Sequence, residues 1–132
     1  MLDKRGEIHN RERARQIRDF SGIIYGNITP TDIDGLIEYH GKGYIILELK
    51  LVGTKIQFGQ KLALERMTDD FQKSGKAALC IIADHTIYDP AKDIIASNTI
   101  VREYRYNFKW TIPTSDTITT KQMMDKFITD IP

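Results

Sequence analysis

The sequence contains little that a covalently braced or membrane-spanning protein would need. Its one cysteine, Cys80, lies inside an apolar run, which favours a buried structural thiol and excludes a disulfide framework or a zinc cluster. No apolar run approaches the roughly 20 residues that cross a bilayer, so no membrane span is predicted. The charged N-terminal stretch has no apolar segment typical of a secretory signal, and we therefore expect a cytoplasmic location.

Repeats, low-complexity segments and Pro-, Gly- or Ser-rich linkers are also lacking across the 132 residues. This length fits one compact domain, so we predict a single domain over residues 1–132. The net charge of +1 neither indicates nor excludes a polyanionic partner. The hydrophobic content of 41% is ordinary for a globular protein and is enough for one core.

The order of apolar patterns predicts an α/β fold, with a small central mixed sheet flanked by helices. The stretch at 22–26 is either a short strand or an irregular connector. Residues 40–43 suit a hairpin, and Ser74-Gly75 suits the end of a helix. We expect helices over 7–18, 57–73 and 119/120–128, and strands over 33–39, 44–51, 76–83 and 98–106, the last extended by or paired with 108–112.

Charged residues interrupt the apolar strand at 44–51, and this interruption is the strongest functional signal. Glu48 and Lys50 are two residues apart, so their side chains share one face of a strand. If Gly41-Lys42-Gly43 forms a three-residue loop, His40 pairs with Tyr44. Asp34 then lies opposite Lys50, diagonal to Glu48 and on the same face. A two-residue loop would instead place the charges on different faces.

Two carboxylates, a main-chain carbonyl and water form the oxygen shell that Mg²⁺ or Mn²⁺ accepts. A lysine beside such an ion could orient an attacking water and offset charge on a pentacovalent phosphorus. These residue types are therefore compatible with a divalent-metal site for phosphoryl chemistry. The alternative is a Glu and Lys ion pair at an exposed strand end.

Asp34, then Glu48-Leu49-Lys50, then a helix carrying Gln60 resembles the PD-(D/E)xK nuclease superfamily. The resemblance implies a restriction-endonuclease-like core in which Asp34 and Glu48 bind the metal, with the Leu49 carbonyl as a further ligand. It assigns the attacking water to Lys50. Asp32 is an alternative to Asp34, because Pro30 is not followed directly by an acidic residue as in the family's namesake motif. The resemblance covers roughly the first 85 residues.

Two helices could complete the site that the resemblance implies. Gln60 is the polar member of an otherwise apolar stripe, and in some branches of the superfamily a Gln here contacts the active site. The Tyr that usually follows four residues later is Leu64 here. An acidic residue of the first helix often lies near the metal in the superfamily, and Glu12 is preferred over Glu7 for this role. An ordinary surface Gln or Glu is the alternative in each case.

Basic residues suggest where nucleic acid could bind. Arg11, Arg15 and Arg18 fall on one face of the first predicted helix, either as phosphate contacts or as a solvated face with intrahelical ion pairs. Tyr104, Tyr106, Phe108 and Trp110 alternate with Arg102, Arg105 and Lys109, a pattern of base stacking or of core packing with surface cations. His85 ends a buried strand, as a structural group or a phosphate contact.

We therefore expect a Mg²⁺- or Mn²⁺-dependent nuclease that hydrolyses phosphodiester bonds, with DNA as the nucleic-acid partner. A non-catalytic nucleic-acid- or protein-binding module on the same fold is the alternative. No membrane partner is expected, and a homo-oligomer is left open, since small nuclease domains often need a second subunit to hold DNA.

Overall fold

The computed structural model describes residues 5–14 and 19–132, which fall into two compact units, Met1–Pro30 and Thr31–Pro132. The first unit contains the short helix α1 (Arg11–Ala14) and an isolated bridge between Tyr25 and Ile28. The second unit contains the sheet, two longer helices and the short 3-10 helix η1 (Ala96–Asn98). No helix within the described ranges has the length and apolar character needed to cross a membrane.

The predicted first helix over 7–18 is wrong at its start. Residues 5–10 form turns and irregular backbone, and α1 begins only at Arg11. The Asn10 side chain accepts a hydrogen bond from the Arg13 N–H at 3.2 Å and so caps the helix at that point. The last four residues of the prediction, 15–18, lie outside the described residues. Of the two alternatives for 22–26, the structure contains the irregular connector.

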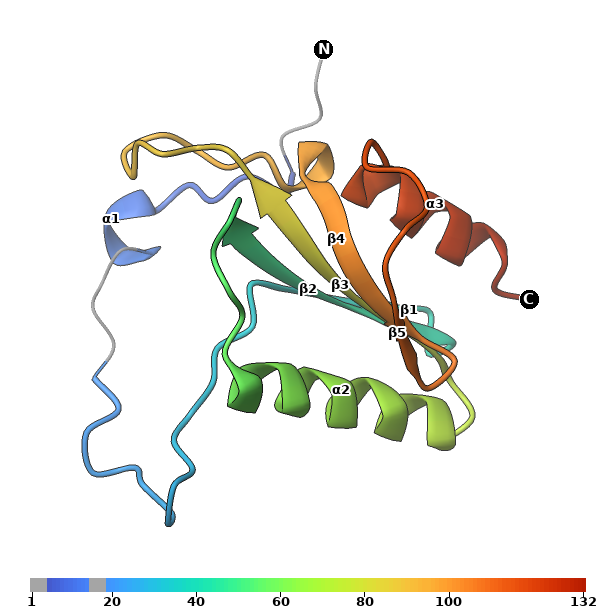
Figure 1. Cartoon of the computed structure of the whole chain (residues 1–132), viewed down its shortest axis with the longest axis horizontal. Coiled ribbons are helices and arrows are strands. Elements are labelled where there is room, and N and C mark those ends of the chain that lie inside the picture. Colours follow the sequence, from blue (N-terminus) through green and yellow to red (C-terminus); the bar gives the residue numbers. More distant parts are fainter. Residues whose placement is uncertain (1–4, 15–18) are drawn as a thin grey trace. The chain divides into compact units, whose positions relative to one another are not determined.

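The second unit is an α/β layer built on a five-stranded mixed sheet in the order β1-β2-β3-β4-β5 (Figure 1). Strands β2 and β3 are parallel and the other neighbouring pairs are antiparallel. The elements are β1 (Gly35–Tyr39), β2 (Gly43–Leu51), α2 (Phe58–Lys73), β3 (Ala77–His85), β4 (Ile100–Tyr106), β5 (Lys109–Thr111) and α3 (Thr120–Thr129).

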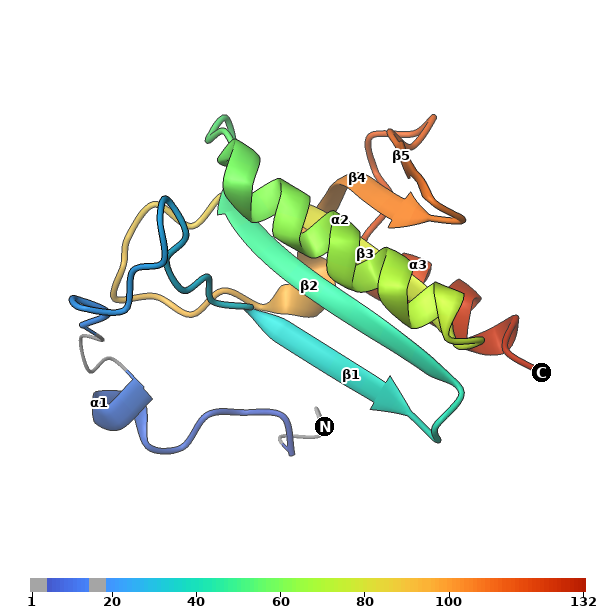
Figure 2. The same ribbon diagram turned by 90° about the horizontal axis from the view of Figure 1, so that it is seen from below.

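The two longer helices lie on opposite faces of the sheet (Figures 1 and 2). On one face, Leu64 of α2 packs with Ile46 and Cys80. On the other, Phe127 of α3 packs with residues that include Ile45 and Ile81. Strand β3 is covered on both sides, which explains why its sequence is almost continuously apolar. We refer to these as the α2 face and the α3 face.

Local signals fix the start of α3 and the end of α2. Thr119 accepts the Gln122 N–H while the Gln122 side chain accepts the Thr119 N–H, a capping box that starts α3 as predicted. Helix α2 ends at Lys73 with Ser74 as its C-cap, and the following Gly75 adopts a φ of 94° that favours glycine.

We expect Ile81→Ala to lower the free energy of unfolding by about 2–5 kcal/mol, because Ile81 is fully buried in the α3-face core and the change leaves a cavity. Ile112→Ala is the matched control, since Ile112 is 73% exposed, and its effect should stay within about 0.5 kcal/mol. Urea denaturation measures both, and equal effects would contradict the assigned core.

Candidate active site

The β1–β2 hairpin brings the start of β1 to the end of β2. Tyr39 pairs with Gly43, so the loop has three residues, but they are 40–42 rather than the predicted 41–43. The predicted pairing of His40 with Tyr44 is therefore wrong: His40 adopts a φ of 52° and turns the chain. The ladder ends at Gly35 opposite Leu47, and the same spacing places Asp34 next to Glu48 rather than opposite Lys50. The shift is two residues, so the predicted face is unchanged.

Asp34 bonds to β2 just beyond the last paired residues of the β1–β2 ladder. Its Oδ2 atom accepts a hydrogen bond from the Leu49 N–H at 2.7 Å. In a strand, the N–H and C=O of one residue point to the same neighbour, so the Leu49 carbonyl is directed to the same edge as Asp34. Asp34, rather than Asp32, is therefore the aspartate that this geometry joins to the Glu48-Leu49-Lys50 segment.

Glu48 is the unusual residue of the site, because it is a carboxylate that is only 4% exposed. Its Oε2 atom is buried and accepts no hydrogen bond from any residue that the structure describes. Burial, reinforced by the negative charge of Asp34, raises the pKa of Glu48 to about 7, against the opposing effects of Lys50 and Gln60. The side chain therefore lacks a partner of positive charge at Oε2.

Lys50 and Gln60 lie beside this carboxylate from two different elements. The Lys50 Nζ atom is 3.5 Å from Glu48 Oε1, and the lysine side chain keeps 21% of its surface exposed. The nearby side chain of Gln60, in the first turn of α2, lowers the pKa of Glu48. The structure thus brings together Asp34, Glu48, Lys50 and Gln60 as the sequence predicted.

The donor set suits a hard divalent cation. The buried oxygen of Glu48 lacks a partner, and the carboxylate of Asp34 and the Leu49 carbonyl are directed to the same strand end. Across residues 5–14 and 19–132, no three His, Cys, Asp or Glu side chains cluster with metal-binding geometry. An ion here would therefore be held by two carboxylates, a carbonyl and water, which Mg²⁺ and Mn²⁺ tolerate.

The residues predicted from the first helix remain predictions. Glu12 and Glu7 are exposed members of the first unit, and Glu7 forms an ion pair with Arg11 at 2.8 Å. That pair matches the intrahelical alternative in its i, i+4 spacing, although residue 7 precedes the helix. Arg15 and Arg18 lie outside the described residues.

The aromatic residues between 104 and 110, which alternate with basic residues, have two kinds of environment in the structure: some pack in the core and one lies in a turn. Trp110 donates its Nε1–H to Glu65 at 2.8 Å and packs against the α2-face core, and Tyr104 packs against the α3-face core. Asn107 and Phe108 have positive φ and form the β4–β5 turn, so Phe108 does not continue the strand. The core-packing interpretation therefore describes Tyr104 and Trp110.

His85 also has a structural role. Its Nδ1 atom accepts the Ile87 N–H at 3.1 Å and orders the chain as it leaves β3. A pocket of about 210 Å³ adjoins this end of β3 and is lined by residues that include Asp84, His85 and Thr99. Asp34, Glu48 and Lys50 do not line it.

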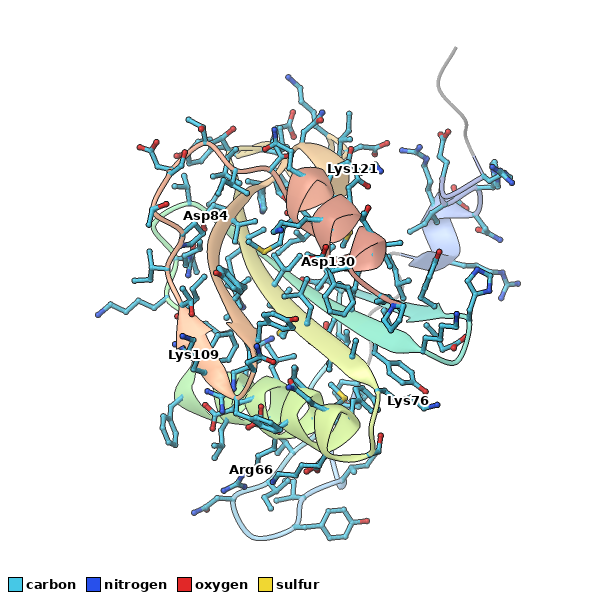
Figure 3. The ribbon with its side chains drawn as sticks, turned by 90° about the vertical axis from the view of Figure 1, so that its right-hand side faces the viewer. Arg66, Lys76, Asp84, Lys109, Lys121 and Asp130 are labelled. Atoms are coloured by element: carbon cyan, nitrogen blue, oxygen red, sulfur yellow. The ribbon has the colours of Figure 1, made fainter. Side chains whose placement is uncertain are left out.

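The ion pair between Asp84 and Arg102, which lies beside the site, was not predicted from the sequence. Asp84, at the opposite end of β3 from Lys76 (Figure 3), accepts hydrogen bonds on Oδ1 from Nε and Nη2 of Arg102 at 2.8 and 2.6 Å. Asp84 pairs with Lys50 across the parallel strands. The only available signal was that both parallel strands end in polar residues.

We expect the free energy of unfolding, measured with a chelator present, to fall as the pH rises from about 4.5 to about 7. Over this range the unfolded chain has released the Glu48 proton while the folded chain retains it, so rising pH favours unfolding. Glu48→Gln removes this pH-dependent contribution to the free energy of unfolding. Its stability relative to wild type should therefore increase with pH, by on the order of 1–3 kcal/mol between pH 5 and 8.

Asp116→Asn is the control, because it removes an exposed carboxylate from a loop. Urea denaturation at several pH values provides the comparison. A difference between Glu48→Gln and wild type that does not change with pH would show that Glu48 titrates normally.

Comparisons with protein-family models, with curated proteins and with solved structures found no match. The functional assignment therefore rests on the geometry of Asp34, Glu48, Lys50 and Gln60.

Proposed function

We propose that this protein is a divalent-metal-dependent nuclease of the PD-(D/E)xK type that hydrolyses phosphodiester bonds in DNA. One observation carries the proposal: Glu48 is buried beside Asp34 and Lys50 with an oxygen that has no partner among the described residues. A Glu and Lys pair at an exposed strand end would not be buried in this way. Keeping a carboxylate out of water is costly unless a positive group compensates it.

The arrangement of elements supports the same proposal. Asp34 precedes β1, Glu48 and Lys50 lie near the end of β2, and α2 then crosses the sheet to the parallel strand β3. The superfamily core has a helix, a hairpin-rich mixed sheet, a crossing helix and a further strand, and the last three of these support the proposal. We therefore propose a restriction-endonuclease-like core for residues 31–85.

Asp34 and Glu48 would hold Mg²⁺ or Mn²⁺ together with the Leu49 carbonyl. When bound, the cation would polarise a phosphoryl oxygen and stabilise the added negative charge of the transition state. The chain contributes a fixed geometry, since Asp34 is tied to the Leu49 N–H and Glu48 is immobilised under α2.

Lys50 would act on the water and the phosphate. Its Nζ atom is near Glu48 and its side chain is partly exposed, so Lys50 can donate a hydrogen bond both to the carboxylate and to a water at the strand end. The water oxygen forms a bond to phosphorus while the bond to the leaving oxygen breaks, and the leaving oxygen takes up a proton from solvent. The water proton passes to solvent, and Lys50 offsets the charge on the phosphoryl oxygens. Gln60 would orient the Glu48 carboxylate.

We expect the full chain to cleave DNA with Mg²⁺ or Mn²⁺ and not with a chelator. Glu48→Gln and Lys50→Met should each lower the cleavage rate by at least about a hundredfold, because each removes charge that acts in the transition state. Gln60→Leu should lower the cleavage rate about tenfold, as expected for a residue that orients a metal ligand. Supercoiled plasmid and labelled single-stranded DNA serve as substrates.

Lys61→Met is the matched control for Lys50→Met, because Lys61 forms its ion pair with Glu103 at 2.8 Å rather than with Glu48. The cleavage rate of Lys61→Met should stay within a few-fold of the wild-type rate. Calorimetric titration with Mn²⁺ provides a second readout, in which Glu48→Gln should bind more weakly. A folded wild-type protein that binds DNA but cleaves none with either metal would leave only the non-catalytic binding module.

A further inference from the structure

We propose that Arg102, held in place by Asp84, binds a backbone phosphate of the DNA beside the bond that is cleaved. The inference rests on the proposed nuclease function, because it assigns a substrate contact to the same site. Neither the Asp-Glu-Lys pattern nor the resemblance includes Arg102 or Asp84 among the site residues.

Strand pairing places Asp84 beside the proposed catalytic groups. In the parallel β2–β3 ladder, Glu48 pairs with Ile82 and Lys50 pairs with Asp84. Directly paired residues project to the same face of a sheet, so the Asp84 side chain lies on the α2 face with Glu48 and Lys50. Because Arg102 binds Asp84, its guanidinium is carried to this part of the α2 face.

A β-bulge directs Arg102 to this position. Ile82 pairs with Glu103 but Ala83 pairs with Val101, so Arg102 is an extra residue between two ladder positions. Without the bulge, a residue next to Glu103 in the strand would point to the α3 face. Bulges re-aim side chains in this way and are common beside active sites.

The donors of Arg102 are only partly used. Its Nε and Nη2 atoms both bind a single oxygen, Asp84 Oδ1, and the two side chains keep 24% and 22% of their surface exposed. Nη1 forms no hydrogen bond or ion pair with any other residue in the described part of the chain. A guanidinium anchored on one edge and open on another can bind phosphate without losing its anchor.

Arg105 shows what a purely structural arginine on the same face looks like. Its Nε and Nη2 atoms bind the two different oxygens of Asp69 at 3.0 and 2.7 Å, and Nη1 lies 3.6 Å from Glu65. The Arg105 side chain is 12% exposed and lies near the ring of Trp110. Arg105 therefore has its charge compensated on all sides and is the natural control.

The charges of the site fit a phosphodiester when a divalent cation is present. With Glu48 ionised, the three carboxylates of Asp34, Glu48 and Asp84 outnumber the two cations of Lys50 and Arg102. One divalent cation reverses this balance and leaves a net positive site. Arg102 would then contact the substrate at the edge of the site away from Asp34, since Asp84 lies on β3 and Asp34 precedes β1.

The test compares Arg102→Gln, Arg102→Lys and Arg105→Gln in the full chain. In single-turnover cleavage of a labelled oligonucleotide with Mg²⁺, we expect Arg102→Gln to raise the half-saturating protein concentration about tenfold. Arg102→Lys should recover part of this loss, since it retains the charge without the fork. Arg105→Gln should leave the half-saturating concentration unchanged while lowering the melting temperature.

A binding measurement separates this inference from the proposed function. Fluorescence anisotropy is measured in a Glu48→Gln background, in which the two carboxylates of Asp34 and Asp84 balance the two cations of the site without a metal. A chelator keeps the DNA intact, and the measurement gives the dependence of affinity on salt. Loss of one phosphate contact should reduce the slope of log K against log salt by about 0.9. This reduction is expected for Arg102→Gln and not for Arg105→Gln.

The outcomes are distinguishable. If wild type cleaves DNA and Arg102→Gln matches Arg105→Gln in both measurements, Arg102 has only a structural role in an ion pair. The proposed phosphate contact is then wrong, whereas the proposed nuclease function is supported. If wild type binds but never cleaves, the nuclease fails, and the salt slopes still show whether Arg102 contacts phosphate. If wild type neither binds nor cleaves DNA, both are overturned.

Discussion

The buried carboxylate of Glu48 is the constraint on which the rest of the site depends. Removing an ionised group from water costs free energy, and here one of its oxygens has no partner in the described part of the chain. The raised pKa of about 7 is the direct consequence. A cation that binds here would remove this penalty, so the same feature that destabilises the free protein would favour metal binding.

The parallel pairing of β2 with β3 explains where polar residues can gather. Both strands are apolar along the length that is covered by helices, and their polar residues are confined to the carboxyl ends. Since parallel strands end at the same edge, Lys50 and Asp84 become neighbours. The hairpin adds Asp34 and the first turn of α2 adds Gln60, so four separate segments meet at one edge.

Two arginines three residues apart in β4 have opposite environments. Arg105 is enclosed by Asp69, Glu65 and Trp110, whereas Arg102 is tied to one oxygen of Asp84 and remains partly open. The bulge at Arg102 creates this difference, because it turns Arg102 towards the proposed catalytic groups, whereas Arg105 lies in the regular part of the ladder. Ion pairs of similar length can therefore differ in function according to how many donors they leave free.

The sequence by itself determined most elements and the face that Asp34, Glu48 and Lys50 share. Strand periodicity is two, so the shared face survived the two-residue error in register. Only the tertiary structure decided the loop at 40–42, the burial of Glu48, the late start of α1 and the pairing of Asp84 with Arg102. These features depend on contacts between distant segments or on single side-chain caps, whereas periodicity is a local property of the chain.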